Sequence, residues 1–360
     1  MRFQLLVDFD SFWENLSRDI QQAEAYTYVQ TFSFEGDRAG KMLADSLSAA
    51  QAPDKRILVD SFSRVVISDR FLYAPRNWRD RELQLEVRET RRLHRTLAAA
   101  GVQIKYGNAV GLSPRRLLKR NHKKLILIDG RVAYIGGINF SEHNAAWHDM
   151  MLRIEDCDAA EFFRKDFLGG WQGHSAKGTE SLAGIELHTL NGRANASTFV
   201  KVLELIEGAQ SSIFIESPYV TFPFYDRLRD ARSRGVQVTI VTPKKNNWNH
   251  FADYAKWEAA RCDIDLRLFK NGMSHLKAML IDDRYLIAGS SNFDFLSYHV
   301  YEEILAIITE PQLIADFRRR VLEVDLANSE RVEEELTAYS SGWSRLRLRL
   351  FNKGLATLLE

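Results

Sequence analysis

Two nearly identical phrases of sequence, one in each half of the chain, constrain the fold more than any other feature. Each phrase begins with a histidine and a lysine that are separated by one residue. Four residues separate the lysine from an aspartate. Six further residues lead to a pair of small residues, one intervening residue and an asparagine. Each key residue of the second phrase lies 153 positions after its counterpart. The matched residues are His122, Lys124, Asp129, Gly136, Gly137 and Asn139 in the first phrase, and His275, Lys277, Asp282, Gly289, Ser290 and Asn292 in the second. One such pattern arises by chance in roughly a few per cent of chains, but two matched copies indicate a duplication.

The residues inside each phrase predict how its polar groups are presented. Residues 125–128 and 278–281 are short apolar runs, which are typical of strands buried on both faces of a sheet. Because side chains alternate along a strand, the histidine and the lysine of one phrase point the same way. The small residues let the backbone pass closely, and the asparagine behind them adds an amide donor. Each phrase is therefore expected to form a half-site, and two facing half-sites would hold a phosphate.

The duplication extends beyond the two phrases. Apolar strands alternate with amphipathic helices in both halves, which predicts an α/β layer architecture in each. The matched segments are 149–154 with 303–308, 26–31 with 212–217, and 57–60 with 238–241. The polar, aperiodic stretch 172–184 is predicted to be a linker. It would separate a first domain, 1–171, from a second domain, 185–340, which a basic amphipathic tail, 341–360, follows.

Composition limits the partners and the compartment. Lysine and arginine number 49 against 48 aspartates and glutamates, so no overall cationic field exists and a nucleic-acid partner is not expected. The two cysteines argue against a disulfide framework, and no His/Cys group has zinc-ligand spacing, so no metal or other cofactor is expected. Acidic residues from Asp8 onward argue against a signal peptide. No apolar run approaches the ~20 residues that span a bilayer, which predicts a cytoplasmic protein, soluble or peripherally membrane-associated.

The doubled phrase resembles the phospholipase D superfamily, and the resemblance covers most of the chain. Three flanking segments are similar to bacterial cardiolipin synthases and related phosphatidyltransferases: Gly136 to Phe140, Ser217-Pro218-Tyr219, and Gly289 to Asp294 leading to Ser297 and Glu303. The resemblance implies two tandem phospholipase D-like α/β/α sandwich domains with mixed sheets, related by pseudo-two-fold symmetry, with the active site at their interface. Many cardiolipin synthases begin with two transmembrane helices, for which this sequence has no candidate.

The resemblance also implies roles for the repeated residues. His122 is expected to attack phosphorus and form a phosphohistidine, and His275 to act as the general acid and base, although the pseudo-symmetry leaves that order open. Lys124 and Lys277 would supply positive charge to the phosphate. Asn139 and Asn292 would donate neutral hydrogen bonds to its oxygens.

Two carboxylates and six further motif residues are expected to support this chemistry. Asp149 and Glu303 lie 27 and 28 residues after their histidines and are expected to orient the far ring nitrogen, unless they form an ordinary salt bridge or cap. The other six are expected to fix loop geometry rather than join the reaction: Asp129, Asp282, Gly136, Gly137, Gly289 and Ser290.

The sequence predicts an enzyme that exchanges alcohols on phospholipid phosphodiesters at an anionic membrane surface, with cardiolipin synthesis from phosphatidylglycerol as the specific expectation. Hydrolysis by a phospholipase D is the main alternative, followed by a phosphodiesterase or nuclease and by a catalytically dead membrane-binding protein. Intact histidines, lysines and asparagines in both copies argue against the last.

Three segments rich in cationic groups have more than one interpretation. Residues 70–81 mix aromatic side chains with arginine, which fits either a headgroup interface or a packed loop. Residues 115–120 fit either an active-site rim or a solvated charge run. In the tail, residues 343–359 would form an amphipathic helix, although their Arg-Leu alternation also suits a strand.

Overall fold

The computed structural model describes residues 1–111, 114–332 and the single positions 346, 350 and 354. Apart from those three positions, the predicted tail, 341–360, lies outside the described residues. Within the described part of the chain, no helix has the length and apolarity needed to cross a bilayer.

The first half of the chain forms a mixed seven-stranded sheet. β2 and β3 are parallel, as are β3 and β6, and the other neighbours are antiparallel. In spatial order the strands are β1 (Arg2–Val7), β9 (Met150–Glu155), β8 (Val132–Gly136), β7 (Leu125–Ile128), β2 (Tyr26–Thr31), β3 (Asp54–Asp60) and β6 (Gln103–Gly107). The runs predicted as buried strands, 125–128 and 278–281, are buried throughout in the structure.

The second half repeats this sheet, strand for strand. The order β11-β17-β16-β15-β12-β13-β14 has the same directions as its counterpart, and β10 and β18 extend it at the two edges. Its strands are β10 (Gly178–Leu182), β11 (Ile185–Asn191), β12 (Ser212–Glu216), β13 (Gln237–Pro243), β14 (Asp265–Phe269), β15 (Ala278–Ile281), β16 (Tyr285–Gly289), β17 (Glu302–Ile308) and β18 (Ser329–Arg331). The predicted duplication and α/β class are confirmed.

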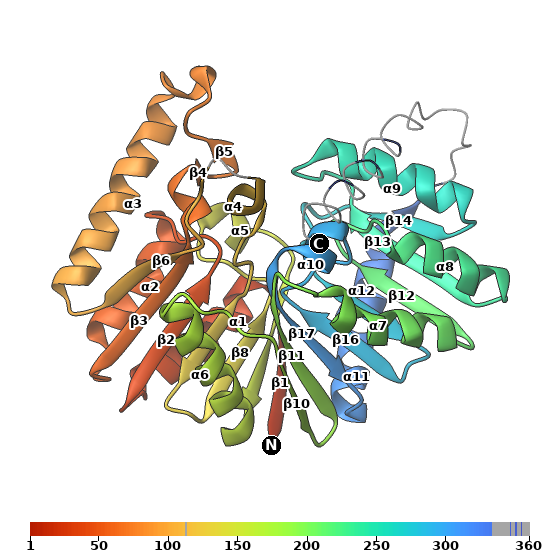
Figure 1. Cartoon of the computed structure of the whole chain (residues 1–360), viewed down its shortest axis with the longest axis horizontal. Helices are drawn as coiled ribbons and strands as arrows, with labels where there is room; N and C mark the ends of the chain where they lie inside the picture. The colour runs from red at the N-terminus through yellow and green to blue at the C-terminus, as the bar shows by residue number, and fades with distance from the viewer. Residues whose placement is uncertain (112–113, 333–345, 347–349, 351–353, 355–360) are drawn as a thin grey trace.

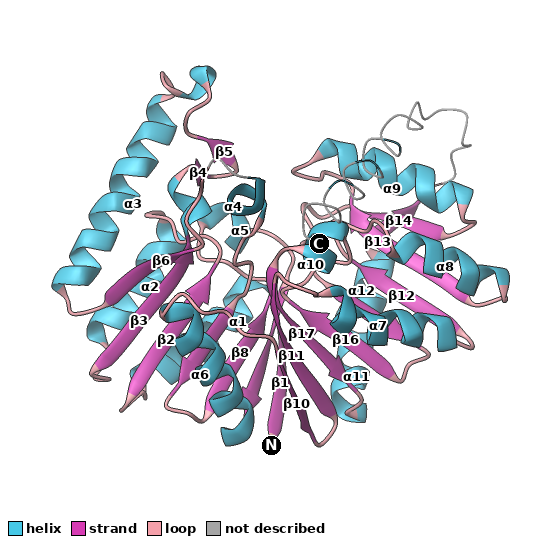
Figure 2. Cartoon of the chain, viewed as in Figure 1, coloured by secondary structure: helices cyan, strands magenta, loops and turns pink. Residues whose placement is uncertain are grey.

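Helices cover both faces of each sheet (Figure 2). Those of the first half are α1 (Asp8–Gln21), α2 (Arg38–Ala49), α3 (Arg81–Ala99), α4 (Pro114–Leu118), α5 (Glu142–Ala145) and α6 (Cys157–Trp171). Those of the second are α7 (Ala196–Gly208), α8 (Phe224–Ser233), α9 (Asn249–Arg261), α10 (Phe295–His299), α11 (Pro311–Phe317) and α12 (Glu323–Ala327). Short elements complete the described chain: the 3₁₀ helices η1 (Ser61–Arg64) and η2 (Pro75–Asn77), the π-helical turn η3 (Arg318–Leu322), and the hairpin β4 (Val66–Ile67) and β5 (Arg70–Phe71).

The two sheets lie side by side and their strands fan out from the centre of the molecule (Figure 1). One continuous apolar core joins the halves, because α6 and α11 pack into it together with strands of both sheets. The segment predicted as a linker, 172–184, is only partly a connection. Residues 178–182 form β10, which pairs with β11 because Thr179 and Leu182 fit the register of an antiparallel ladder. The domain boundaries otherwise stay a prediction.

The aspartate of each phrase ties its strand to the start of the neighbouring strand. The carboxylate of Asp129 accepts hydrogen bonds from the backbone N–H groups of residues 24–26, each at 2.8 Å. Asp282 does the same for residues 210–212, at 2.8 to 3.0 Å. Both aspartates have φ of 52°, a left-handed conformation that aspartate tolerates better than most residues. This geometry agrees with a structural role for both.

Candidate active site

The two repeated phrases meet where the halves of the chain touch. Two short parallel bridges cross between the halves there, one joining Asn121 to Glu302 and the other joining His148 to Ser274. The backbone N–H of His122 donates to the carbonyl of Glu302 at 2.9 Å, and that of His275 donates to the carbonyl of His148 at 2.7 Å. The bridges are equivalent under the repeat, so each histidine enters the site alongside the other half of the chain.

Each histidine is paired with a carboxylate from the other half. His122 Nδ1 lies 2.9 Å from Glu303 Oε1, and His275 Nδ1 lies 2.7 Å from Asp149 Oδ2. The spacing in the sequence associated each carboxylate with the histidine of its own half, and this pairing is wrong. The cause is the pair of bridges, which bring the residue before each carboxylate alongside the opposite histidine. In the tautomer that carries its proton on Nδ1, facing the carboxyl oxygen, the Nε2 lone pair of each ring is available for chemistry.

The lysines of the two phrases are buried beside these pairs. Lys124 Nζ donates to the carbonyl of His122 at 2.8 Å, and Lys277 Nζ donates to that of His275. Burial lowers the pKa of Lys124 to about 7 and that of Lys277 to about 8, although the charges of Glu303 and Asp149 oppose the shift. Because a bound phosphodiester is anionic, it would favour the charged form of both amines.

Burial keeps both imidazoles neutral in the free site. It is the largest cause that lowers the pKa of His122 and His275 well below 6.5, and the lysine charges add to it. The charge of His122 also contributes to the lowering for His275, so the two rings lie close enough to interact. Burial likewise raises the pKa of Asp149 to about 6 and that of Glu303 to about 8. A neutral imidazole is the form that can attack phosphorus.

Small residues make the site asymmetric. Ser290 Oγ donates to Glu303 Oε2 at 2.5 Å, whereas its counterpart Gly137 has no side chain. A Cβ atom at Gly137 would lie 2.2 Å from Asp149 Oδ1. Glycine is also needed at the preceding positions, Gly136 and Gly289, where a Cβ would lie 2.3 and 2.2 Å from carbonyl oxygens of the next strand. In each half the residue after the glycine therefore packs directly against the carboxylate: Gly137 against Asp149, and Ser290 against Glu303.

The two asparagines also differ in their surroundings. Asn139 Oδ1 lies 3.2 Å from Thr31 Oγ1 and 3.3 Å from the backbone nitrogen of Phe32, and accepts from both. Among the described residues, the buried Oδ1 of Asn292 has no hydrogen-bond partner. The side chain of Asn139 is thus oriented by the two hydrogen bonds to its Oδ1, and its amide nitrogen can donate to a ligand.

Aromatic rings that the sequence analysis did not single out pack against the histidines. The ring centroid of Trp147 lies 4.9 Å from that of His275, and Tyr301 and Phe32 lie 5.6 and 5.3 Å from His122. Trp147 and Tyr301 each precede an orienting carboxylate by two residues. This repeated aromatic at a matched offset is the signal that could have revealed them.

Two further residues, Arg120 and His148, stabilise the structure around the site. Arg120 is buried rather than part of a rim, and it forms an ion pair with Asp60 at 3.0 Å. The second oxygen of Asp60 accepts the backbone N–H of Asn121 at 2.6 Å, so this pair positions the residue before His122. His148 has Asp8 at 2.7 Å from Nδ1 and Asp325 at 2.9 Å from Nε2. Burial alone would lower its pKa, but these hydrogen bonds raise the pKa to about 11, which favours the cationic form of His148 between the halves.

Two half-sites that face each other across a pair of matched sheets define a phospholipase D-type enzyme. The family model described as "Cardiolipin synthase, PLD-like domain" matches residues 16–171 and 202–324. The chain belongs to this family.

Known relatives and solved structures agree with this membership. The chain is 24% identical over 391 residues to cardiolipin synthase 1 of Staphylococcus epidermidis strain ATCC 12228, covering 100% of this chain and 74% of the relative. It is 24% identical over 386 residues to cardiolipin synthase of Staphylococcus aureus strain Mu50, covering 99% of this chain and 72% of the relative. Phosphatidylserine synthase of Haemophilus influenzae Rd KW20 shares the fold, with a TM-score of 0.68, 16% identity and coverage of 99% and 94%. Polyphosphate kinase of Porphyromonas gingivalis also shares the fold, with a TM-score of 0.63 and 12% identity. The match covers 98% of this chain and 53% of the kinase.

Proposed function

We propose that the enzyme transfers a phosphatidyl group from one phosphatidylglycerol to another and so makes cardiolipin. The observation that supports the proposal is the crossed pair of histidine–carboxylate contacts, together with the burial of both histidines and both lysines. Neither half alone has both a nucleophile and a separate proton donor for a phosphodiester.

The reaction proceeds in two displacements at phosphorus. In the first, Nε2 of His122 forms a bond to phosphorus while the bond from phosphorus to the headgroup glycerol breaks. His275, protonated when the anionic substrate is bound, gives its proton to the departing glycerol oxygen. In the second, His275 removes a proton from a hydroxyl of the acceptor lipid, whose oxygen displaces His122. The products are cardiolipin and one glycerol.

The lysines and asparagines hold the phosphate through both displacements. Lys124 and Lys277 are fixed by the histidine carbonyls, so their remaining N–H donors can face the phosphate oxygens without further ordering. Asn139 has its carbonyl engaged behind it and can donate through its amide nitrogen. Preorganised donors of this kind favour the charge that develops during the displacement.

The aromatic rings around the imidazoles support transfer over hydrolysis. Phe32 and Tyr301 contact the ring of His122, and Trp147 contacts that of His275. These side chains occupy space in which water would otherwise solvate the two imidazoles. Hydrolysis to phosphatidate is the competing outcome, because water and an alcohol can attack the same intermediate. The near-balance of charged residues disfavours a nucleic-acid substrate.

Attachment to an anionic membrane is proposed to involve residues 71–78. Phe71, Tyr73 and Trp78 are 49%, 61% and 63% exposed, which is unusual for large aromatic side chains. They lie at the end of β5 and in the segment that joins β5 to α3, which projects at the top of the molecule in Figure 1. Neighbouring arginines would attract anionic headgroups while the rings enter the interface.

The test is product analysis with vesicles of phosphatidylglycerol. We expect cardiolipin and free glycerol in equal amounts, identified by mass spectrometry, and no cleavage of oligonucleotides. Phosphatidate and glycerol without cardiolipin would show a hydrolase, and cleavage of the oligonucleotides alone would show a nuclease. A protein with Ala in place of both His122 and His275 is the control for contaminating activity.

A further inference from the structure

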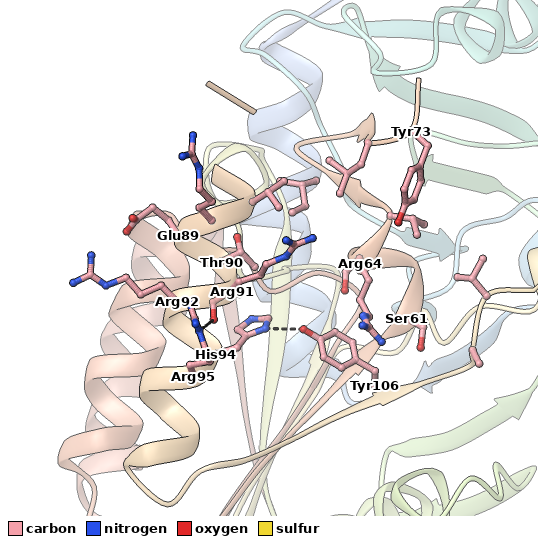
Figure 3. A pocket seen from close by; sticks show the side chains of 18 residues that line it. Ser61, Arg64, Tyr73, Glu89, Thr90, Arg91, Arg92, His94, Arg95 and Tyr106 are labelled. Atoms are coloured by element: carbon pink, nitrogen blue, oxygen red, sulfur yellow. Dashed lines mark hydrogen bonds between the residues drawn. The ribbon is translucent and has the colours of Figure 1, made fainter. Parts of the chain in front are cut away.

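A cavity of about 1000 Å³ lies between α3 and η1, outside the candidate active site. Its floor is formed by a hydrogen bond of 2.6 Å between His94 Nδ1 and the hydroxyl of Tyr106 (Figure 3). The space is many times larger than a single ion and lies at the upper end of what small-molecule sites occupy.

The polar lining of the cavity is strongly cationic. Five arginines line it, one on η1 and four on α3: Arg64, Arg88, Arg91, Arg92 and Arg95. The only acidic lining residue, Glu89, forms an ion pair with Lys41 at 3.8 Å. Within the described part of the chain, none of the five arginines forms an ion pair with a carboxylate. The positive charge is therefore available to a ligand.

Two of these arginines face each other across the cavity. Arg91 extends from α3 toward Arg64 on η1, whereas Arg92 extends to the opposite side of the helix (Figure 3). The guanidinium of Arg64 lies over the ring of Tyr106, 5.1 Å from its centroid, which restricts its position. Two guanidinium groups that reach into one cavity from different elements are suited to hold a phosphate between them.

Part of the lining is apolar. Ile67 and Val87 belong to a small buried cluster against which Leu72 packs, and all three contribute to the wall of the cavity. Tyr73, which is 61% exposed, also lines it and lies in the aromatic segment proposed to contact the membrane. A ligand that fills the whole cavity must thus combine an anionic group with hydrocarbon.

Side chains of η1 and of Phe32 lie between the cavity and the candidate active site. Ser61, Ser63 and Arg64 of η1 line the cavity, while Phe62 of the same turn packs against Phe32 with ring centroids 6.1 Å apart. Phe32 in turn contacts His122. The cavity and the histidines therefore lie on opposite sides of η1, and a ligand in one does not occupy the other.

We infer that this cavity binds a phosphate-bearing amphiphile, an anionic phospholipid, with its phosphate between Arg64 and Arg91 and its glycerol and first acyl carbons against Ile67, Leu72 and Val87. The site is additional to the one that holds the reacting phosphodiester, and its existence does not depend on the transfer reaction. An enzyme with such a site would hold two phospholipids at once.

The proposal is tested by counting bound lipids. Dihexanoyl phosphatidylglycerol, below its micelle concentration, is titrated calorimetrically into protein carrying His122→Ala and His275→Ala, so that no turnover occurs. The same background with Arg64→Gln and Arg91→Gln is expected to bind one lipid fewer, or to bind it at least about tenfold more weakly, because two charge-assisted contacts are lost. Arg2→Gln, at an exposed arginine of β1 that does not line the cavity, is the control and is expected to leave the titration unchanged.

The other arms separate lipid from free anion. Inorganic phosphate and glycerol 3-phosphate are expected to bind at least about tenfold more weakly than the lipid, because they leave the apolar wall uncovered. Equal binding of inorganic phosphate would overturn the assignment to a lipid. Unchanged lipid binding after Arg64→Gln and Arg91→Gln in a folded protein would overturn the site itself. If the wild-type enzyme made no cardiolipin, the loss of one bound lipid in this variant would still stand.

Discussion

The Nδ1 atom of His275 lies 2.7 Å from Oδ2 of Asp149, a residue that precedes it by more than a hundred positions and belongs to the other half of the chain. His122 and Glu303 form the reciprocal contact. The site is thus interlocked: the histidine of each half depends on the other half for its orientation, so separating the halves would disable both.

Replacing Asp149 by Asn should lower kcat for transfer by about 100-fold or more, within the range of general acid–base contributions. The amide can donate its N–H to Nδ1, which moves the ring proton to Nε2 and removes the lone pair with which Nε2 must accept a proton. Steady-state kinetics on short-chain phosphatidylglycerol, with thermal unfolding as a check on folding, measures this. Ser297→Ala, which removes only a 3.0 Å hydrogen bond to Glu303, is a milder control. Wild-type kcat in the Asn variant would contradict an orienting role.

Gly137 should tolerate no side chain. An alanine Cβ there would meet Asp149 Oδ1 at 2.2 Å and push the carboxylate away from His275. We expect Gly137→Ala to lower kcat at least about tenfold and to cost about 1–3 kcal/mol in the free energy of unfolding, as overpacking does elsewhere. Ser290→Gly at the equivalent position creates no clash and should cost less stability. Urea unfolding together with kinetics tests both, and a fully active, stable Gly137→Ala protein would refute the packing argument.

The value of kcat/KM should fall as the pH rises through about 7 to 8. Burial lowers the pKa of Lys124 to about 7 and that of Lys277 to about 8, so both amines lose their charge above these values in the free enzyme. A neutral amine attracts the phosphodiester less, and kcat/KM reports the free enzyme. The profile of kcat/KM on a soluble short-chain substrate is the measurement. A value that stays constant well above pH 8 would show that the lysine charges do not govern binding.

Deleting residues 341–360 should weaken sedimentation with anionic vesicles, more at low salt than at high salt. This prediction rests on sequence, since the tail's aromatic, leucine and arginine side chains would attract anionic lipid at roughly 1 kcal/mol per arginine. Activity on a soluble phosphodiester should survive. If the truncated protein instead lost thermal stability and all activity together, the tail would be a packing element rather than a membrane anchor.

The sequence was sufficient for the fold and for which residues gather, but not for how they pair. The doubled phrase predicted both buried strands, because apolar runs and alternation are local properties of the chain. The crossed pairing of Asp149 with His275 depends on the bridge between His148 and Ser274, a contact between distant segments with no local signature. Arg120 was ambiguous for the same reason: its partner Asp60 lies at the end of β3, far from it in sequence. The strand at 178–182 was missed because its polar composition resembles a linker, whereas pairing with β11 determines its conformation.

The measurement that tests the central claim most directly uses a phosphatidyl ester of p-nitrophenol, whose leaving group needs no proton. In the His275→Ala protein we predict one rapid equivalent of nitrophenolate per active site, followed by a stall, with the phosphatidyl group found on His122 by mass spectrometry. The His122→Ala protein should release none. A burst from the His122→Ala protein and none from His275→Ala would reverse the two roles, and steady turnover by either variant would contradict a shared two-histidine site.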